Sequence, residues 1–575
     1  MGGKIPGPHR CFTMRNPFAR ALVLGLGLFV LCAMMARSDR LDVRTTIVRT
    51  GTFPKNAIPA PQRPPAQQAA WVQQLATPTE EHDGKETASV GQAFLNVSHY
   101  MACDYNMEQL RKWKIKFGFE EKFEYTKRYV RAERLDIPRK SITNLRQNFL
   151  PERVKSLNVS KKYKPGVCPE PLTVPVSRSP FPSMANLSDF MFGVSTTYKR
   201  FSDPRTSPVN DWTFWLTNGK GASNGGKLVL TLTDASDEEL ENAADELFDA
   251  GIDADVFRSD ANMLMAVRYL ALVPLMYNHP EREGKRMRGQ GWSKMRKKWL
   301  VLADDDTFFP APHELAQRFR AYNEEQPMYV GTFSEDVNNI ARHGSQAFGG
   351  GGVFLSVPTA QQITEDYDSC KTDDKVREAN SGWGPQGDIL LRKCIDENSE
   401  TKLTLLNDLW QLDMYGDPSG FYESGIKPLS LHHYRGGGWH VAHPWHYTKV
   451  ASICGEDCTL QRFQTADDFI ISNGFSVAYY PEGIDFDVNQ VERTFHPAPE
   501  DKEWNFDFAF GPQRQSLHES GRKISWDLQE ANIQEDGSVS QIYVRKHSDW
   551  RWKNSDGSEM SEMDGIIELV WLPMH

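Results

Sequence analysis

The sequence predicts an α/β fold built around a mostly parallel β-sheet, and three observations support this class. From Phe190 to Ser334, short apolar runs alternate with segments of helical periodicity. Several runs end in polar or acidic residues, as expected where strands reach a ligand-binding edge of a sheet. Hydrophobic residues make up 39% of the 575 residues and charged residues 25%, which is ample for a sizeable core.

The start of the chain departs from this pattern. The first 20 residues are basic without any acidic residue, and residues 21–36 are apolar and uncharged. With Phe18 and Ala19 included, the run approaches the ~20 residues that cross a bilayer as a helix. The basic flank predicts a cytoplasmic tail at residues 1–17 and a type II transmembrane anchor at residues 18–36. A cleaved signal peptide is the alternative, and both place most of the chain in a lumen or outside the cell.

Three further regions flank the predicted α/β domain of residues 186–440. Residues 37–95 are expected to form an extended stem, because they include a stretch rich in Pro, Gln and Ala. Residues 96–185 mix aromatic and basic residues and are predicted to be an accessory region packed on the α/β domain. Residues 441–575 carry no motif, but FSVAYYPEG and DGIIELVWLP predict strands of a β-rich C-terminal extension.

Sequons and cysteines fit a secretory compartment. N-glycosylation sequons begin at Asn96, Asn158 and Asn186, although three are unremarkable in a chain of this length. Six cysteines come after the apolar run, and an even number in an oxidising compartment permits three disulfides. Cys454 and Cys458 are spaced to close a small loop. A zinc site is the less favoured alternative, because no matching CxxC pair exists.

Four apolar runs are predicted to be buried strands of the sheet. They are FMFGVSTT from Phe190, KLVLTLT from Lys227, WLVL from Trp299 and MYVG from Met328, the first leaving into a polar turn. Ligands bind beyond the carboxyl ends of strands in open α/β sheets. That rule points to Asp234 and to the acidic triplet of residues 304–306.

Helical segments separate these strands. A capping box at Ser236 is expected to open an acidic helix that runs to Ala250. Ser259 is expected to cap a second helix, which Pro274 kinks or shortens. A third helix is predicted from Pro312.

The sharpest chemical signal is the triplet Asp304, Asp305 and Asp306, directly after the WLVL strand and one alanine. Adjacent carboxylates repel one another unless a cation compensates them, and oxygen ligands suit Mg²⁺ or Mn²⁺. A DxD after such a strand is how many nucleotide-sugar transferases hold a metal against a diphosphate. The alternative is a solvated acidic loop or a helix cap. The apolar strand before the triplet and the aromatic pair after it disfavour that alternative.

In order and content, the motifs resemble the Fringe-like β1,3-glycosyltransferases (glycosyltransferase family 31), in the fungal branch long described as a domain of unknown function. The resemblance covers Phe190 to Tyr434 and implies a GT-A-type, Rossmann-like fold with inverting transfer from a UDP-sugar. Seven segments carry it: FMFGVSTTYKRF, LTLTDA, WLVLADDDTFF, MYVGTFS, AFGGGGVFLS, GWGPQGDILLRKCI and PLSLHHY.

The resemblance also implies a metal site. Asp306 matches the family's direct ligand, Asp304 completes the DxD, and His432 matches the metal-binding histidine. The adjacent His433 leaves the choice of histidine open, and a structural histidine bonded in the core is the alternative for either. Mn²⁺ (or Mg²⁺) is the expected ion.

Catalytic and donor-binding positions are inferred in the same way. Asp388 matches the carboxylate base that would accept the acceptor's proton, and a helix N-cap is the alternative. The sequence departs from the family pattern at Gly387, where a second acidic residue is expected, and this leaves the base open. By family position alone, the uridine or phosphate contacts are Thr196, Thr197, Arg200, Asp234 and Asp305.

Together these features predict an inverting, metal-dependent enzyme that moves a hexose from a UDP-sugar to a glycan or glycoprotein hydroxyl. It is expected in the Golgi membrane with its catalytic domain in the lumen. The alternatives are a non-catalytic, lectin-like or chaperone-like relative and a metal-dependent hydrolase. The hydrolase would need more Asp and His ligands at close spacing. The net charge of -10 argues against nucleic acid as a partner.

Overall fold

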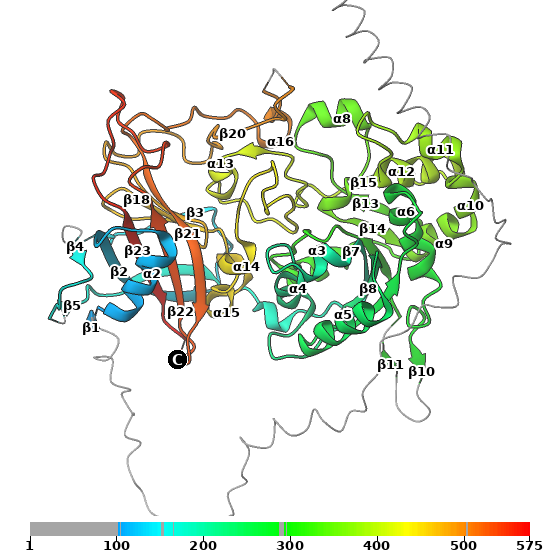
Figure 1. The fold of residues 1–575 in the computed structure, drawn as a ribbon, viewed down its shortest axis with the longest axis horizontal. Helices are drawn as coiled ribbons and strands as arrows, with labels where there is room; N and C mark the ends of the chain where they lie inside the picture. Colours follow the sequence, from blue (N-terminus) through cyan, green and yellow to red (C-terminus); the bar gives the residue numbers. More distant parts are fainter. Residues whose placement is uncertain are drawn as a thin grey trace, which may run out of the picture. The chain divides into compact units, whose positions relative to one another are not determined.

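Two β-sheets organise the computed structural model (Figure 1). It describes residues 102–103, 105–150, 155–164, 166–286, 292–294, 296–501 and 504–574. The predicted cytoplasmic tail, anchor, stem and Asn96 sequon lie outside these residues. Within them, each helix is too short or too polar to cross a bilayer.

A seven-stranded sheet carries the predicted α/β domain. Its strand order is β15-β13-β14-β12-β7-β8-β9, and β14 alone runs antiparallel to its neighbours in this sheet. The sheet is therefore mostly parallel, as the sequence predicts. The strands are β7 (Phe190–Thr197), β8 (Lys227–Thr233), β9 (Ala254–Arg258), β12 (Trp299–Leu302), β13 (Tyr329–Gly331), β14 (Val353–Ser356) and β15 (Leu403–Leu405).

Helices connect these strands. They are α3 (Tyr198–Ser202), α4 (Val209–Leu216), α5 (Asp237–Asp249), α6 (Met265–Tyr277), α7 (Pro312–Phe319), α8 (Val337–His343), α9 (Val357–Glu365), α10 (Tyr367–Cys370), α11 (Asp373–Glu378) and α12 (Gly387–Asn398). The predicted capping box is confirmed, because Ser236 and Glu239 satisfy each other's backbone amides at the start of α5. The polar turn expected after β7 is instead the short helix α3.

The cap predicted at Ser259 is wrong. Residues 254–258 form the edge strand β9, and the amide of Ser259 bonds to the carbonyl of Leu232 on β8 (2.9 Å). Helix α6 therefore begins only at Met265. Pro274 lies near the end of α6, where its missing N–H removes one bond and the helix continues to Tyr277.

A ten-stranded sheet joins the accessory region to the C-terminal extension. Its main path is β3-β17-β18-β19-β21-β22-β23-β2-β4, and β6 pairs with β2. Figure 1 shows the blue strand β2 beside the red strand β23. The two regions treated separately in the sequence thus form one sheet. Its strands are β2 (Lys122–Leu135), β3 (Ile142–Asn144), β4 (Lys155–Asn158), β6 (Leu172–Ser177), β17 (Arg462–Gln464), β18 (Phe469–Ser472), β19 (Ser476–Tyr479), β21 (Ile524–Ile533), β22 (Val539–Arg545) and β23 (Gly565–Trp571).

Shorter elements complete the described chain. Two-residue ladders pair β1 (Ala102–Cys103) with β5 (Gly166–Val167) and β16 (Tyr415–Gly416) with β20 (Phe495–His496), and β10 (Lys285–Arg286) pairs with β11 (Trp292–Lys294). The remaining helices are α2 (Met107–Phe117), α13 (Ser419–Tyr422), α14 (Pro444–Tyr447), α15 (Ala451–Cys454) and α16 (Asp507–Phe510), with 3₁₀ turns η3 (Pro182–Met184), η4 (Gly349–Gly351) and η5 (Glu456–Cys458).

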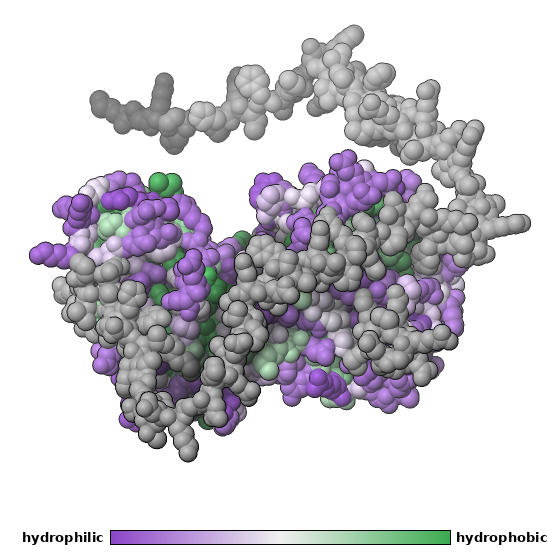
Figure 2. Space-filling view, turned by 90° about the horizontal axis from the view of Figure 1, so that it is seen from below, coloured by the Kyte–Doolittle hydropathy of each residue, from purple (hydrophilic) through white to green (hydrophobic). Residues whose placement is uncertain are grey.

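One hydrophobic core runs through both sheets. It contains Phe192 and Trp215 from the seven-stranded side and Phe463 and Trp571 from the ten-stranded side. Aromatic stacking links the segments between them, as in the pair Tyr422 and Phe475 (ring centroids 4.8 Å apart). Most of the described surface visible in Figure 2 is hydrophilic, with apolar residues in smaller patches.

Each of the five cysteines whose side chain the structure describes is in a disulfide. Cys370 pairs with Cys394 between α10 and α12, Cys454 pairs with Cys458, and Cys168 is also disulfide-bonded. The small loop predicted between Cys454 and Cys458 is therefore confirmed. This pattern is typical of an oxidising compartment.

Candidate active site

The acidic triplet leaves strand β12 at the carboxyl edge of the seven-stranded sheet. Thr307 holds it in place, because its Oγ1 accepts the amide of Asp304 (2.9 Å) and donates to the carbonyl of Gly350 (2.9 Å). The triplet is thereby tied to the glycine turn η4, which precedes β14.

Asp304, Asp306 and His432 converge on one point. The Nε2 of His432 lies 3.1 Å from Oδ1 of Asp306 and 3.3 Å from Oδ2 of Asp304. One ligand atom from each of the three lies within 4.8 Å of the others. The structure thus brings together all three residues that the sequence predicts as metal ligands.

A backbone carbonyl orients the histidine. Nδ1 of His432 lies 3.2 Å from the carbonyl oxygen of Gln411, a distance at which Nδ1–H donates to it. The lone pair of Nε2 then points at the two carboxylates, the tautomer that a metal-binding histidine requires. His432 is buried, whereas the side chain of Asp304 is 42% exposed, so the cluster opens toward solvent on the aspartate side.

Electrostatics at this point favour a positive charge. Burial opposes protonation of His432, but the carboxylates of Asp306 and Asp304 raise its pKa well above the ordinary value. Burial likewise opposes ionisation of Asp306, yet His432 brings the pKa of that carboxyl below its ordinary value. Without a metal ion, a proton on His432 would supply the charge that the carboxylates need.

The neighbouring His433 makes its ring contact and its polar contact outside the acidic triplet. Its backbone has φ 57°, and its ring stacks on Trp439 with centroids 3.8 Å apart and an interplanar angle of 9°. Its Nδ1 lies 3.2 Å from Oδ1 of the buried Asp413. His432 is therefore the histidine of the acidic cluster.

Gly350 makes room for His432. A Cβ added to this glycine would overlap the imidazole ring. The turn is fixed on both sides, because the amide of Gly351 donates to Oε1 of Gln411 (3.0 Å) and its carbonyl accepts from Ser430 (2.7 Å). The glycine run thus serves as a tight support for the histidine.

Asp305 has a different role from its neighbours. It is buried and accepts two bonds from the guanidinium of Arg200, at 2.7 Å from Nε and 2.5 Å from Nη2. The hydroxyl of Thr196 also donates to it. Three of the five predicted donor contacts therefore form one linked group.

Of the other two predicted contacts, Thr197 touches this group through the backbone of Arg200 and Asp234 lies apart from it. Thr197 caps α3 by accepting the amide of Arg200 (3.2 Å). Asp234 is exposed just after β8, with a left-handed φ of 61°. Among the described residues, no hydrogen bond or ion pair connects Asp234 with the rest of the candidate site.

Asp388 lies in the first turn of α12, but Gln386 is the N-cap residue. The cap alternative is therefore not what the structure shows, although Oδ1 of Asp388 accepts the amide of Ile389 (2.8 Å). Burial raises the pKa of Asp388 to about 6. The amides of Ile389 and Gly349 oppose this shift, and the charge of Asp304 adds to it. A carboxylate with such a pKa is suited to general base chemistry.

Tyr269 explains why the second acidic residue is absent at Gly387. A Cβ on Gly387 would lie 2.6 Å from Cβ of Tyr269 on α6, so this position has no room for a side chain. The Tyr269 hydroxyl is buried and has no hydrogen-bond partner among the described residues. Burial raises its pKa, and the charges of Asp304 and Asp388 add to this shift.

Sequence reasoning missed Tyr269, Gln411 and Arg435. Arg435 directly follows the PLSLHHY segment and pairs with Asp211 (2.6 Å), and its charge acts on both Asp306 and Arg200. Its position close to a predicted metal ligand was an available signal. Gln411 contributes its backbone carbonyl to His432, and no side-chain pattern reveals such a role.

Comparisons with known proteins gave a match to one family model and no curated relative. Solved structures share low similarity with the chain. Mouse xyloside xylosyltransferase 1, in its apo form, is 14% identical over 38% of this chain and 85% of that chain, with a TM-score of 0.24. The glycosyltransferase GlyE of Streptococcus pneumoniae TIGR4 is 12% identical over 38% and 45%, with a TM-score of 0.23.

A third structure is the mannosyltransferase PcManGT of Pyrobaculum calidifontis, in complex with GDP-Man and Mn²⁺. It is 11% identical over 40% of this chain and 59% of that chain, with a TM-score of 0.22. At such TM-scores we draw no conclusion from these three likenesses. The Fringe-like family model matches residues 185–413, which include six of the seven segments that carry the resemblance. Residues 185–413 are therefore similar to the Fringe-like family.

Proposed function

We propose that this protein is an inverting, metal-dependent glycosyltransferase that moves a hexose from a UDP-sugar to a hydroxyl of a glycan or glycoprotein. The observation that carries the proposal is the convergence of Asp304, Asp306 and His432 at the carboxyl edge of the sheet. His432 lies beyond residue 413, where the family match ends, so its position is evidence independent of that match.

The three side chains suit a divalent cation. Two carboxylate oxygens and one imidazole nitrogen form a mixed donor set that fits Mn²⁺, with Mg²⁺ as the alternative. The carboxylates repel each other and raise the pKa of His432 against the effect of its burial, so the cluster favours an added positive charge. When bound, the ion would offset the charge that develops on the diphosphate of the leaving nucleotide.

Two arginines are suited to hold the donor's diphosphate. Arg200 is oriented by its paired bonds to Asp305, and its side chain remains 48% exposed. Arg435 is fixed by Asp211 near the same carboxylates. Guanidinium groups held in this way recognise phosphate oxygens well. We assign Thr196, Thr197 and Asp234 to the donor side by their strand-end positions.

Asp388 is the proposed base. The acceptor hydroxyl attacks the anomeric carbon, its proton passes to the Asp388 carboxylate, and the electrons of the old C–O bond leave with the nucleotide. Burial keeps water away from this carboxylate and raises its pKa to about 6, closer to the operating pH than that of an exposed aspartate.

The proposed reaction is tested by incubating the purified chain with a panel of UDP-sugars, Mn²⁺ and oligosaccharide acceptors while UDP release is measured. We expect release with one donor, and its loss in the variant Asp306→Ala or on adding chelator, because the site then lacks a ligand or the ion. Unchanged turnover in Asp306→Ala would contradict the metal role. Absence of release with every donor would favour the non-catalytic alternative.

The glycine turn offers a test that does not alter a ligand. Gly350→Ala should displace the His432 ring and weaken Mn²⁺ binding by roughly 10–100-fold, the usual cost of disturbing a ligand's support. Mn²⁺ affinity can be measured by electron paramagnetic resonance. The matched control is Gly349→Ala, whose added Cβ meets the Tyr269 hydroxyl (2.9 Å) and leaves His432 untouched. Equal Mn²⁺ affinity in the two variants would argue against His432 as a ligand.

The base is tested with Asp388→Asn, which keeps the shape of the side chain but cannot accept a proton. We expect kcat to fall by roughly 10²–10⁴-fold, the usual value of general base catalysis. Donor affinity and melting temperature should change little, since the amide oxygen can still accept the N–H of Ile389. Asp396→Asn on the exposed face of α12 is the control. A normal kcat in Asp388→Asn would mean that another group removes the proton.

We further propose that the protein resides in the Golgi membrane as a type II protein with residues 18–36 as its anchor. The disulfides of the described residues support exposure to an oxidising lumen. In sealed microsomes the region after residue 36 should resist added protease until detergent is present. Cleavage of that region without detergent would contradict this orientation.

A further inference from the structure

A cavity of ≈ 420 Å³ lies outside the groups that the proposed reaction uses. Its walls come from the segment after His432, from strand β21 and from the loop between β22 and β23. The volume falls in the ~300–1,000 Å³ range of small-molecule sites. Its lining residues lie beyond the Fringe-like match, so the cavity is a feature of the C-terminal part of the chain.

Exposed apolar side chains form part of its wall. Trp550 is 58% exposed although its ring contacts His518 edge-on (centroids 5.2 Å apart), and Val441 is 55% exposed. Trp439 lines the same cavity. Large apolar side chains that remain open to solvent in a concave site mark a binding surface rather than a core.

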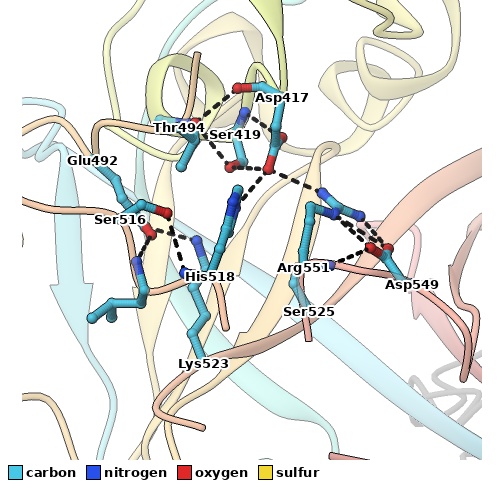
Figure 3. Close-up of polar contacts among 12 residues, drawn as sticks. Asp417, Ser419, Glu492, Thr494, Ser516, His518, Lys523, Ser525, Asp549 and Arg551 are labelled. Atoms are coloured by element: carbon cyan, nitrogen blue, oxygen red, sulfur yellow. Dashed lines mark hydrogen bonds and ion pairs between the residues drawn. The ribbon is translucent and has the colours of Figure 1, made fainter. Parts of the chain in front are cut away.

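Arg551, Asp417 and Asp527 line the polar side of the cavity, and Figure 3 shows Arg551 with Asp417 and with Asp549, which lies outside the lining. The guanidinium of Arg551 bonds to Asp549 (2.7 Å), to Asp417 (3.3 Å) and to Asp527. Asp417 also lies 2.9 Å from Nε2 of His518. Burial opposes ionisation of Asp417, but Arg551 and His518 bring its pKa below the ordinary value. Both oxygens of Asp417 also accept bonds from Ser419, so the carboxylate open to a ligand is Asp527, whose side chain is 27% exposed.

The charges of these residues limit which classes of ligand the cavity can bind. Two carboxylates and one guanidinium line the cavity, and Asp549 adds a third carboxylate at Arg551; this excess of carboxylates disfavours phosphate, sulfate or an acidic sugar. It favours ligands that donate hydrogen bonds without carrying a negative charge. A neutral sugar meets both requirements, because its hydroxyl groups donate and its C–H face packs on an indole ring.

Stacked rings connect the cavity with the candidate active site. Trp439 stacks on His433, and the rings of His433 and His432 have centroids 3.8 Å apart. Trp439 thus contacts His433, the neighbour of His432, and also lines the cavity. A ligand in the cavity would lie beside the segment that positions His432.

We infer that this cavity binds a neutral saccharide unit of the acceptor, stacked on Trp550 and hydrogen-bonded to the carboxylate of Asp527. The acceptor role rests on the proposed transferase function, whereas saccharide binding does not. The C-terminal extension would then select the acceptor glycan, and the Fringe-like domain would bind the donor.

Binding is tested with the full chain and three probes, cellobiose, lactose and mannobiose, by saturation-transfer NMR without nucleotide sugar or metal. We expect at least one disaccharide to bind, and to bind at least tenfold more weakly to Trp550→Ala and to Val441→Arg. Both positions are exposed, so the variants should keep the melting temperature of the native chain. Phe248→Ala, an equally simple loss of an exposed aromatic outside the cavity, should bind normally.

Two results would overturn the inference: no binding of any probe, or equal binding by the native chain and both cavity variants. The same variants also separate this inference from the proposed function. In a transfer assay, Trp550→Ala should raise the acceptor KM while UDP release to water stays normal. Saccharide binding without UDP release from any donor would support the saccharide site and refute the transferase function. UDP release together with unchanged saccharide binding in both cavity variants would support the transferase and refute the saccharide site.

Discussion

The repulsion between neighbouring carboxylates at the end of strand β12 is the constraint around which the candidate site is arranged. Asp305 pairs with the guanidinium of Arg200, whereas Asp304 and Asp306 share the Nε2 of His432. Two features of the surrounding backbone position His432 in this arrangement. The carbonyl of Gln411 sets the histidine's tautomer, and the glycine turn leaves room for its ring.

Much of the α/β domain could be predicted because its signals are local. The strands at Phe190, Lys227 and Trp299 are short apolar runs, and the capping box at Ser236 is a four-residue pattern. The edge strand β9 was missed because its ADVFR sequence has no clear alternation and comes soon after the helix. Because this strand was not recognised, Ser259, the residue directly after it, was wrongly predicted to cap a helix.

The candidate site was only partly visible in the sequence. The triplet and His432 were found by motif and resemblance, and the structure brings them together. Roles that depend on backbone atoms, or on the space left where a residue has no side chain, have no recognisable sequence pattern. The carbonyl of Gln411, the space beside Gly350 and the ring of Tyr269 against Gly387 are features of packing between distant segments. The sheet shared by the accessory region and the C-terminal extension is equally non-local.

That shared sheet imposes an order of events during synthesis. Residues 124–130 of strand β2 pair with β23, and the paired residues Val130 and Trp571 are separated by 441 positions (571 minus 130). At roughly 5–20 residues per second, β2 emerges on the order of 20–90 seconds before its partner. Throughout that interval one edge of β2 lacks its neighbour and can pair wrongly with other chains. A chain truncated before β23 would keep this edge of β2 open and would therefore be prone to aggregation, even with its seven-stranded sheet complete.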